Sequence, residues 1–213
     1  MKSSRWKRYD AKSGLWIQSN KRIYVYWFKF LQHAENDSNR QVDWSSYEGW
    51  GGADEFDKDD KFDAWWRKRW KTLFGYKLGE TEPLYGLNNK KPQPDGVRYS
   101  LLVYELKDKP LLNGQVVDEV NGIVGDYWEI AKRIAVKEYP KRREKGKKDK
   151  SYKPEEWGFN IARKSIAREL RKTNPVEFNK KRRTVQSRVG RYMRSAKNHL
   201  DSVCEGRFPY KSP

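Results

Sequence analysis

The chain has 213 residues, 36% of them hydrophobic and 15% aromatic, and its formal net charge is +18 at pH 7. A single cysteine and two histidines exclude an internal disulfide and a structural zinc site built from Cys and His side chains. No apolar run approaches the roughly 18 residues of a membrane span, and no signal peptide is visible at the start, so we expect a cytoplasmic protein.

The excess positive charge lies at one end of the chain. Residues 132–213 contain 26 Lys or Arg against 9 Asp or Glu, whereas the preceding residues have a net charge of only +1. Segregated charge of this size concentrates a polyanion on one side of a molecule. We therefore expect nucleic acid as the partner of the second half, with a solvated basic tail as the alternative.

The sequence of the first half predicts an aromatic-rich helical domain over residues 1–80. Its basic start, residues 1–18, is expected to be an arm or a short irregular segment. Residues 20–36 (NKRIYVYWFKFLQHAEN) place apolar side chains at helical spacing, although their β-branched and aromatic residues would also suit a buried strand. Residues 36–60 are rich in Asn, Asp, Ser and Gly, which indicates a loop.

A second helix is predicted over FDAWWRKRWKTLF, which begins at Phe62. Its apolar residues form one stripe, Asp59 or Asp60 can act as its N-cap, and Gly75 can end it. Residues 75–98 then contain four Gly and three Pro, and within them we place a linker or ordered loop at residues 81–98.

The second domain is predicted over residues 99–213. Residues 99–106 suit a short strand or a short buried helical segment, and residues 116–139 have helical periodicity. Residues 140–153 are a charge run that we expect to be mobile. Residues 155–172 predict a further helix, whose inner face consists of Phe159, Ala162, Ile166 and Leu170.

The last predicted helix has an apolar seam on one side. Its seam residues follow one another at spacings of three or four, and they are Val185, Val189, Tyr192, Ala196, Leu200 and Val203. Asn174-Pro175-Val176-Glu177 is a good helix start. The sequence leaves open whether the helix runs unbroken from Pro175 or restarts near Thr184, and a restart would give a helix-turn-helix.

The side of this helix opposite the seam has the chemistry of a nucleic-acid reader. Guanidinium groups bind phosphate or guanine with two hydrogen bonds, and small hydroxyls reach phosphate oxygens. We expect a mainly α protein whose C-terminal half is a trihelical unit with the last helix as reader, and an ordinary basic bundle is the alternative. The predicted binding residues are Lys164, Arg168, Arg171, Lys180, Arg183, Thr184, Ser187, Arg188, Arg191, Arg194 and Asn198.

Three segments resemble a loosely defined group of proteins. The ending RTVQSRVGRYMRSAKNHLDSVCEGRFP resembles helix-turn-helix-type proteins of phages and other bacterial mobile elements, where a basic helix runs into a Gly-x-Phe-Pro tail. YWFKFLQHA and FDAWWRKRWKTLF resemble the aromatic front domain of the same group. The resemblance implies DNA binding by a regulator, replication factor or partition factor. The long 75–98 loop and the lysine-rich 141–153 insert depart from that pattern.

The sequence carries no motif of a common enzyme, so we expect neither catalysis nor a cofactor. It lacks a phosphate-binding P-loop, a zinc-binding histidine pair and a nucleophile elbow. Carboxylates that could hold metal occur only in one cluster, whose spacing fits no calcium loop. Helix capping and a solvated acidic face that docks on the basic half are the alternative for this cluster, which comprises Asp54, Glu55, Asp57, Asp59, Asp60 and Asp63.

Tryptophan is concentrated in the front half, with eight of the ten residues among the first 70. Exposed rings would stack on the bases of a single strand, but the spacing favours rings that are mostly buried. Three functions follow, none with a membrane partner: a duplex DNA binder, an RNA-binding subunit of a ribonucleoprotein, or an adaptor that holds a protein through its acidic and aromatic front half.

Overall fold

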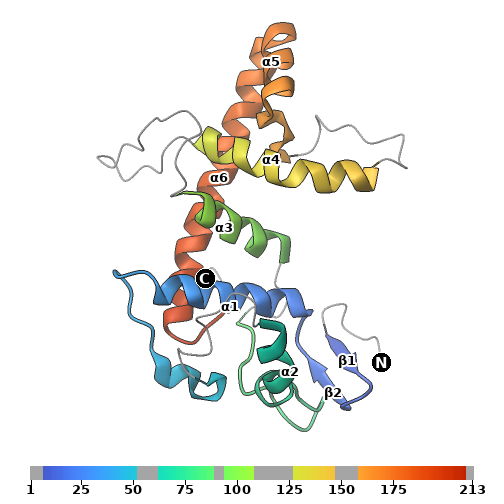
Figure 1. The fold of residues 1–213 in the computed structure, drawn as a ribbon, viewed down its shortest axis with the longest axis vertical. Helices are drawn as coiled ribbons and strands as arrows, with labels where there is room; N and C mark the ends of the chain where they lie inside the picture. Colours follow the sequence, from blue (N-terminus) through green and yellow to red (C-terminus); the bar gives the residue numbers. More distant parts are fainter. Residues whose placement is uncertain (1–6, 52–61, 89–93, 108–126, 147–157, 210–213) are drawn as a thin grey trace. The chain divides into compact units, whose positions relative to one another are not determined.

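A computed structural model describes residues 7–51, 62–88, 94–107, 127–146 and 158–209, and these residues are mainly helical (Figure 1). The chain forms two compact units. Unit 1 comprises Met1–Leu101 together with Ser195–Pro213, and unit 2 comprises Leu102–Arg194. This division differs from the predicted boundaries, because the end of the chain packs with the front half. None of the helices in the described ranges is long and apolar enough to cross a membrane.

Unit 1 begins with a small hairpin where the sequence predicted an irregular arm. Strand β1 (Arg8–Asp10) pairs antiparallel with β2 (Leu15–Ile17). Gly14 occupies the turn with a φ of 71°, a left-handed conformation that favours glycine. Strands of three residues are too short to show the alternation by which a strand is recognised.

Two helices that the sequence predicts, one within residues 20–36 and one beginning at Phe62, are present in unit 1. Helix α1 (Lys21–Glu35) is capped by the Asn20 side chain, which accepts a hydrogen bond from the Arg22 backbone N–H, so the strand alternative for this segment is wrong. Helix α2 (Phe62–Leu73) has the predicted apolar stripe. Its predicted N-caps, Asp59 and Asp60, lie outside the described residues.

Two segments predicted as loop contain helix. Residues Trp44–Trp50 form the 3-10 helix η1 inside the predicted 36–60 loop, and helix α3 (Pro94–Lys107) begins inside the predicted linker. The Asp43 side chain caps η1 by accepting from the Ser45 N–H, which supplies local order that composition alone does not reveal. Residues 99–106 are therefore helical rather than a strand.

Aromatic rings form most of the core of unit 1. Trp27 is fully buried, with ring centroids 5.3 Å from Trp50 and 5.5 Å from Phe208. Phe74 packs 4.4 Å from Tyr24 and 5.6 Å from Trp50 in the same cluster. The prediction that the front-half rings are mostly buried is confirmed for these residues, and each such ring removes roughly 150–250 Å² from water.

Residues of η1 hold the end of helix α6 (Pro175–Cys204) in this core. The Tyr47 hydroxyl donates to the Val203 carbonyl at 2.6 Å and accepts from Trp27 Nε1 at 3.1 Å. The Asp43 N–H donates to the Cys204 carbonyl at 2.9 Å. Carbonyls in the last turn of a helix have no partner within it. The Val203 carbonyl also accepts from the Gly206 N–H at 3.2 Å, so it has two donors from outside the helix.

Unit 2 contains the end of α3 from Leu102, α4 (Tyr127–Gly146), the 3-10 helix η6 (Gly158–Ala162), α5 (Lys164–Thr173) and most of α6. The predicted 116–139 helix is described only from Tyr127 onward, and residues 140–146 continue α4, which corrects the expectation of a mobile run there. Trp128 and Phe178 meet edge to face, with ring centroids 5.9 Å apart, within the core of the unit.

The predicted 155–172 helix is in fact two elements. Extended backbone at Arg163, with φ −67° and ψ 138°, separates η6 from α5. Helix α6 runs unbroken from Pro175, and Asn174 alone connects it to α5. The restart near Thr184 is therefore wrong, and with it the form of helix-turn-helix that depended on that restart.

His199 lies buried near the end of α6. Its ring centroid is 5.2 Å from that of Phe30 and 5.3 Å from that of Phe208, and its exposed fraction is 5%. Burial among apolar rings lowers the pKa of His199 to about 4, because the charged imidazolium loses its hydration there.

We expect Tyr47→Phe to destabilise the protein by roughly 1–3 kcal/mol, because Trp27 Nε1 and the Val203 carbonyl lose a buried partner. Urea unfolding followed by tryptophan fluorescence measures this loss. Tyr9→Phe is the matched control, since it removes a hydroxyl from a side chain that is 57% exposed. Equal stability of the two variants would contradict the prediction.

We also expect stability to fall as the pH is lowered from about 6.5 to 4. The unfolded chain has an ordinary His199 pKa and takes up a proton first, whereas the folded state binds it only near pH 4. The folded state therefore loses as much as about 3 kcal/mol over this range. Urea midpoints should depend less on pH in His199→Gln than in the wild type or His33→Gln, and unchanged pH dependence in His199→Gln would refute the assignment.

Candidate nucleic-acid interface

Helix α6 carries an uninterrupted basic stretch. Between Glu177 and Asp201 the sequence has eight Lys or Arg and no Asp or Glu. Its other side is apolar and buried, which confirms the predicted seam for Val185, Val189, Ala196, Leu200 and Val203. Tyr192 is half-buried, and Met193, which the prediction omitted, joins the buried side.

Nine of the eleven predicted binding residues are exposed in the structure. On α6 they follow one another at spacings of one to four, on the side away from the buried residues. On α5, where no residue is buried, they follow one another at spacings of three or four. The exposed residues are Lys164, Arg168 and Arg171 on α5, and Lys180, Arg183, Thr184, Ser187, Arg191 and Arg194 on α6.

Two predicted residues are half-buried instead. Arg188 places its guanidinium 6.0 Å from the Phe159 ring centroid, so it packs on an aromatic ring of η6 as well as bearing charge. Asn198 belongs to the part of α6 that lies in unit 1, whereas the other ten residues belong to unit 2. The ten predicted residues of unit 2 thus lie on two successive helices of one unit.

Contacts with nearby side chains and backbone groups alter the charges and hydrogen-bonding groups that α6 presents to solvent. Lys181 lies 3.6 Å from the Glu177 carboxylate, four residues earlier on the helix, which offsets its charge. Arg182 packs over the Trp128 ring at 5.6 Å, a role that the sequence analysis did not find. The Thr184 hydroxyl donates to the Lys180 carbonyl at 3.1 Å, so its oxygen is left as an acceptor toward solvent.

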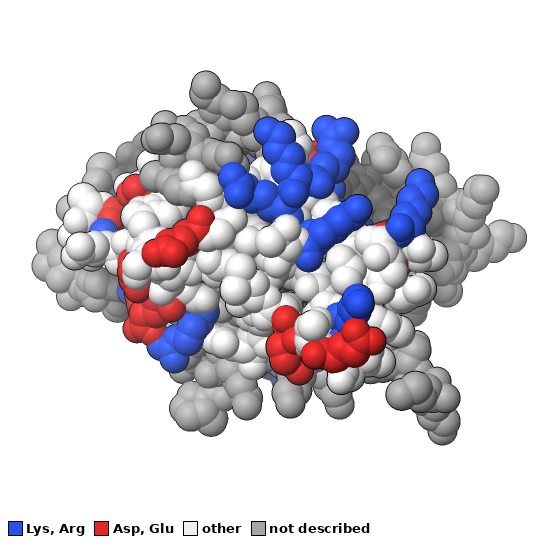
Figure 2. All heavy atoms as spheres, turned by 90° about the horizontal axis from the view of Figure 1, so that it is seen from below, with Lys and Arg blue, Asp and Glu red and all other residues white. Residues whose placement is uncertain are grey.

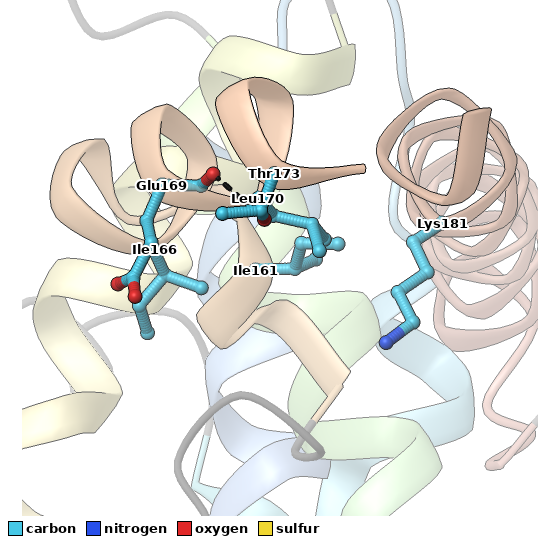
Figure 3. Close-up of a pocket in the computed structure, with 6 residues that line it drawn as sticks. All are labelled: Ile161, Ile166, Glu169, Leu170, Thr173 and Lys181. Carbon is cyan, nitrogen blue, oxygen red and sulfur yellow. Dashed lines mark hydrogen bonds between the residues drawn. The ribbon is translucent and has the colours of Figure 1, made fainter. Parts of the chain in front are cut away.

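A pocket lies beside these residues, between α5 and α6. Its volume is about 320 Å³, and Figure 3 shows Lys181 of α6 on the opposite side of the pocket from Ile161 and Leu170. Ile166 and Leu170 were predicted to join Phe159 and Ala162 in the core, but only the latter two are buried. The break between η6 and α5 accounts for this, because it rotates the second pair away from the face of the first. The pocket is completed by Glu169 and Thr173.

Metal chemistry has no visible basis in the described part of the chain. No group of three His, Cys, Asp or Glu side chains in those ranges is arranged to hold an ion. Most of the predicted acidic cluster, Asp54 to Asp60, lies outside them. Its last member, Asp63, is described and pairs with Lys21 at 2.5 Å, which places it in a surface ion pair on α2.

In unit 2, guanidinium, ammonium and hydroxyl groups are exposed on two successive helices, and such groups can bind the oxygens of a polyanion. The sequence matches no protein-family model and no curated protein, and the fold matches no solved structure. The resemblance to helix-turn-helix proteins of mobile elements stays a prediction, and none of these comparisons assigns a function.

Proposed function

We propose that the protein binds nucleic acid, with duplex DNA as the preferred form, through the exposed basic sides of α5 and α6. The observation that carries the proposal is the two-sided character of α6. Val189 on its inner side is fully buried, while Arg183, Arg191 and Arg194 are exposed on its outer side, and no carboxylate interrupts them between Glu177 and Asp201.

The dimensions of this surface suit duplex DNA. From Lys180 to Arg194 the helix rises about 21 Å, at 1.5 Å per residue. The major groove, about 12 Å wide, admits an α-helix, and arginine is the side chain that most often reads guanine there. Lysines and hydroxyls on the same side supply the phosphate contacts that position a helix in the groove.

The proposed role is that of a regulator, replication factor or partition factor of a mobile element. This role rests on the sequence resemblance and on the preference for duplex DNA. Since such DNA is located in the cytoplasm of a bacterium, the cytoplasm is the proposed location. Binding to RNA in a ribonucleoprotein and a pure adaptor role are the competing functions that the binding experiments below distinguish.

We expect the replacement of Arg183, Arg191 or Arg194 by Ala to weaken duplex binding by roughly 1 kcal/mol or more, with little change in thermal stability. Val189→Asp should instead unfold unit 2, because it buries an unpaired charge. Fluorescence anisotropy and thermal melting give the two readouts. Arg22→Ala, an exposed change on α1, is the control. Similar stability losses in the Arg variants and Val189→Asp would refute the orientation of the helix.

We expect duplex affinity to depend steeply on salt. If about five phosphates are neutralised, log K should fall against log salt with a slope near −4 to −5. Isotherms at several salt concentrations on duplex DNA, single-stranded DNA and RNA measure this slope. If α6 reads the base sequence, the protein should bind one DNA sequence at least about 4 kcal/mol more tightly than random DNA at the same salt concentration. A slope near zero on all three would favour the adaptor, and a steep slope on RNA alone would favour the ribonucleoprotein subunit.

A further inference from the structure

A row of aromatic side chains crosses the small sheet of unit 1. In the hairpin Tyr9 lies directly opposite Trp16, and Trp16 in turn forms an antiparallel bridge with Tyr76. The bridge has two hydrogen bonds, Trp16 N–H to the Tyr76 carbonyl at 2.8 Å and Tyr76 N–H to the Trp16 carbonyl at 3.0 Å. Residues directly opposite one another on antiparallel strands share a face, so the three rings lie on one side of the sheet.

The row runs from the interior of unit 1 to its surface. Tyr76 is 4% exposed, Trp16 is half-buried and Tyr9 is 57% exposed. The ring centroids of Tyr9 and Trp16 are 5.2 Å apart. Most other large rings of the unit, such as Trp27 and Trp50, are fully buried in the core. The Tyr9 ring, with the Trp16 ring beside it, is therefore an aromatic surface that lies outside the core and is partly open to solvent.

Cations lie on the hairpin and beside it. The Lys7 ammonium lies 5.7 Å from the Tyr76 ring centroid, and Arg8 and Lys12 are exposed on the hairpin. Lys71 of α2 lies near the hairpin turn: the pKa of Asp10 is lowered chiefly by the Ser13 hydroxyl, and also by the charges of Lys71 and Lys12. Figure 2, a view of the structure from below, shows Lys and Arg side chains gathered in one area, with most Asp and Glu side chains in separate groups.

We propose that the Tyr9–Trp16 pair and its neighbouring cations form a binding site for single-stranded nucleic acid. An unpaired base stacks on the Tyr9 ring, while Lys7, Lys12 and Lys71 bind the adjoining phosphates. Paired bases are already stacked within a duplex and do not offer a free face. The site thus goes beyond the proposed function, since it lies in unit 1 and takes a different form of nucleic acid from that assigned to α5 and α6.

The combination of rings and cations selects this ligand over other candidates. A neutral sugar would use the rings but gain nothing from the cations. An acidic protein segment would use the cations but has no flat ring system to stack unless it presents an aromatic side chain. A single strand uses both, because every nucleotide has one flat base and one charged phosphate.

The experiment measures binding of the full chain to a dT12 oligomer, to a U12 oligomer and to a 12-mer of abasic nucleotides. The abasic strand keeps the phosphates and lacks the bases, so it separates stacking from charge. We expect wild type to bind dT12 and U12 roughly tenfold more tightly than the abasic strand. Similar binding to dT12 and U12 is expected because stacking does not involve the 2′-hydroxyl, and the two arms distinguish DNA from RNA as the preferred strand.

Tyr9→Ala should abolish most of the difference between dT12 and the abasic strand, whereas Tyr9→Phe should retain it. Leu84→Ala, which trims a side chain of unit 1 that is 64% exposed, is the matched control. Binding to a random-sequence duplex should be the same in wild type and Tyr9→Ala. The α6 arginine variants test the proposed function through duplex binding, and Tyr9→Ala tests this site through dT12 binding. If the arginine variants lose duplex binding but still bind dT12, failure of one proposal can be told apart from failure of the other.

A second measurement does not depend on the stability of any variant. An oligomer containing 5-iodouridine is crosslinked by light to the wild-type protein, and the crosslinked peptide is found by mass spectrometry. The proposal expects the crosslink at Tyr9 or Trp16. It is overturned if the crosslinks map only to α5 and α6, if the abasic strand binds as tightly as dT12, or if an acidic peptide competes with dT12 as well as U12 does.

Discussion

The hydroxyl of Tyr47 connects three parts of the chain that are far apart in sequence. It donates to the Val203 carbonyl in the last turn of α6 and accepts from the indole of Trp27 in α1, all within an aromatic core. Burial raises the pKa of Tyr47 far above its ordinary value, so the hydroxyl remains a neutral donor. This contact gives α6 a fixed end in unit 1, and the same helix continues into unit 2, where its exposed arginines lie.

A helix that presents long cationic side chains to solvent needs its other side to be fully used in packing. In α6 this side consists of Val185, Val189 and Met193 in unit 2, followed by Ala196, Leu200 and Val203 in unit 1. The arginines carry mutual repulsion, which folding must overcome. Aromatic contacts reduce this cost for Arg182 and Arg188, whose guanidinium groups lie over Trp128 and Phe159.

The sequence predicted the elements whose signal is local and periodic. The spacing of apolar residues identified α1, α2 and the buried side of α6. Once the buried side of α6 was known, the cations on its opposite side could be predicted to be exposed. The break at Arg163 was missed because residues at i and i+3 share a side in both 3-10 and α-helices, so Phe159 and Ala162 fitted either one. The pocket and the packing of Arg182 on Trp128 depend on that break and on contacts between elements, which no local pattern contains.

The division into units could not be read from composition. The Gly- and Pro-rich stretch at 75–98 has the character of a linker, yet it belongs to unit 1. Within it, the Tyr85 N–H donates to the Leu73 carbonyl and the Asn88 N–H to the Phe208 carbonyl. Such pairings are set by tertiary structure. The exposed Tyr9 was likewise hidden among many aromatic residues, because the sequence gives the number of rings but not which of them the core leaves uncovered.

The position of Phe208 has a consequence for the order in which the protein folds during synthesis. Its ring is fully buried against Trp27, but about 180 residues separate the two along the chain, so the aromatic core of unit 1 cannot close until Phe208 has left the ribosome. Unit 2 consists of one continuous segment and emerges before residues 195–213. Unit 1 therefore has many contacts of high sequence separation, which fold slowly, and its tryptophans are exposed to chaperones and to aggregation throughout translation.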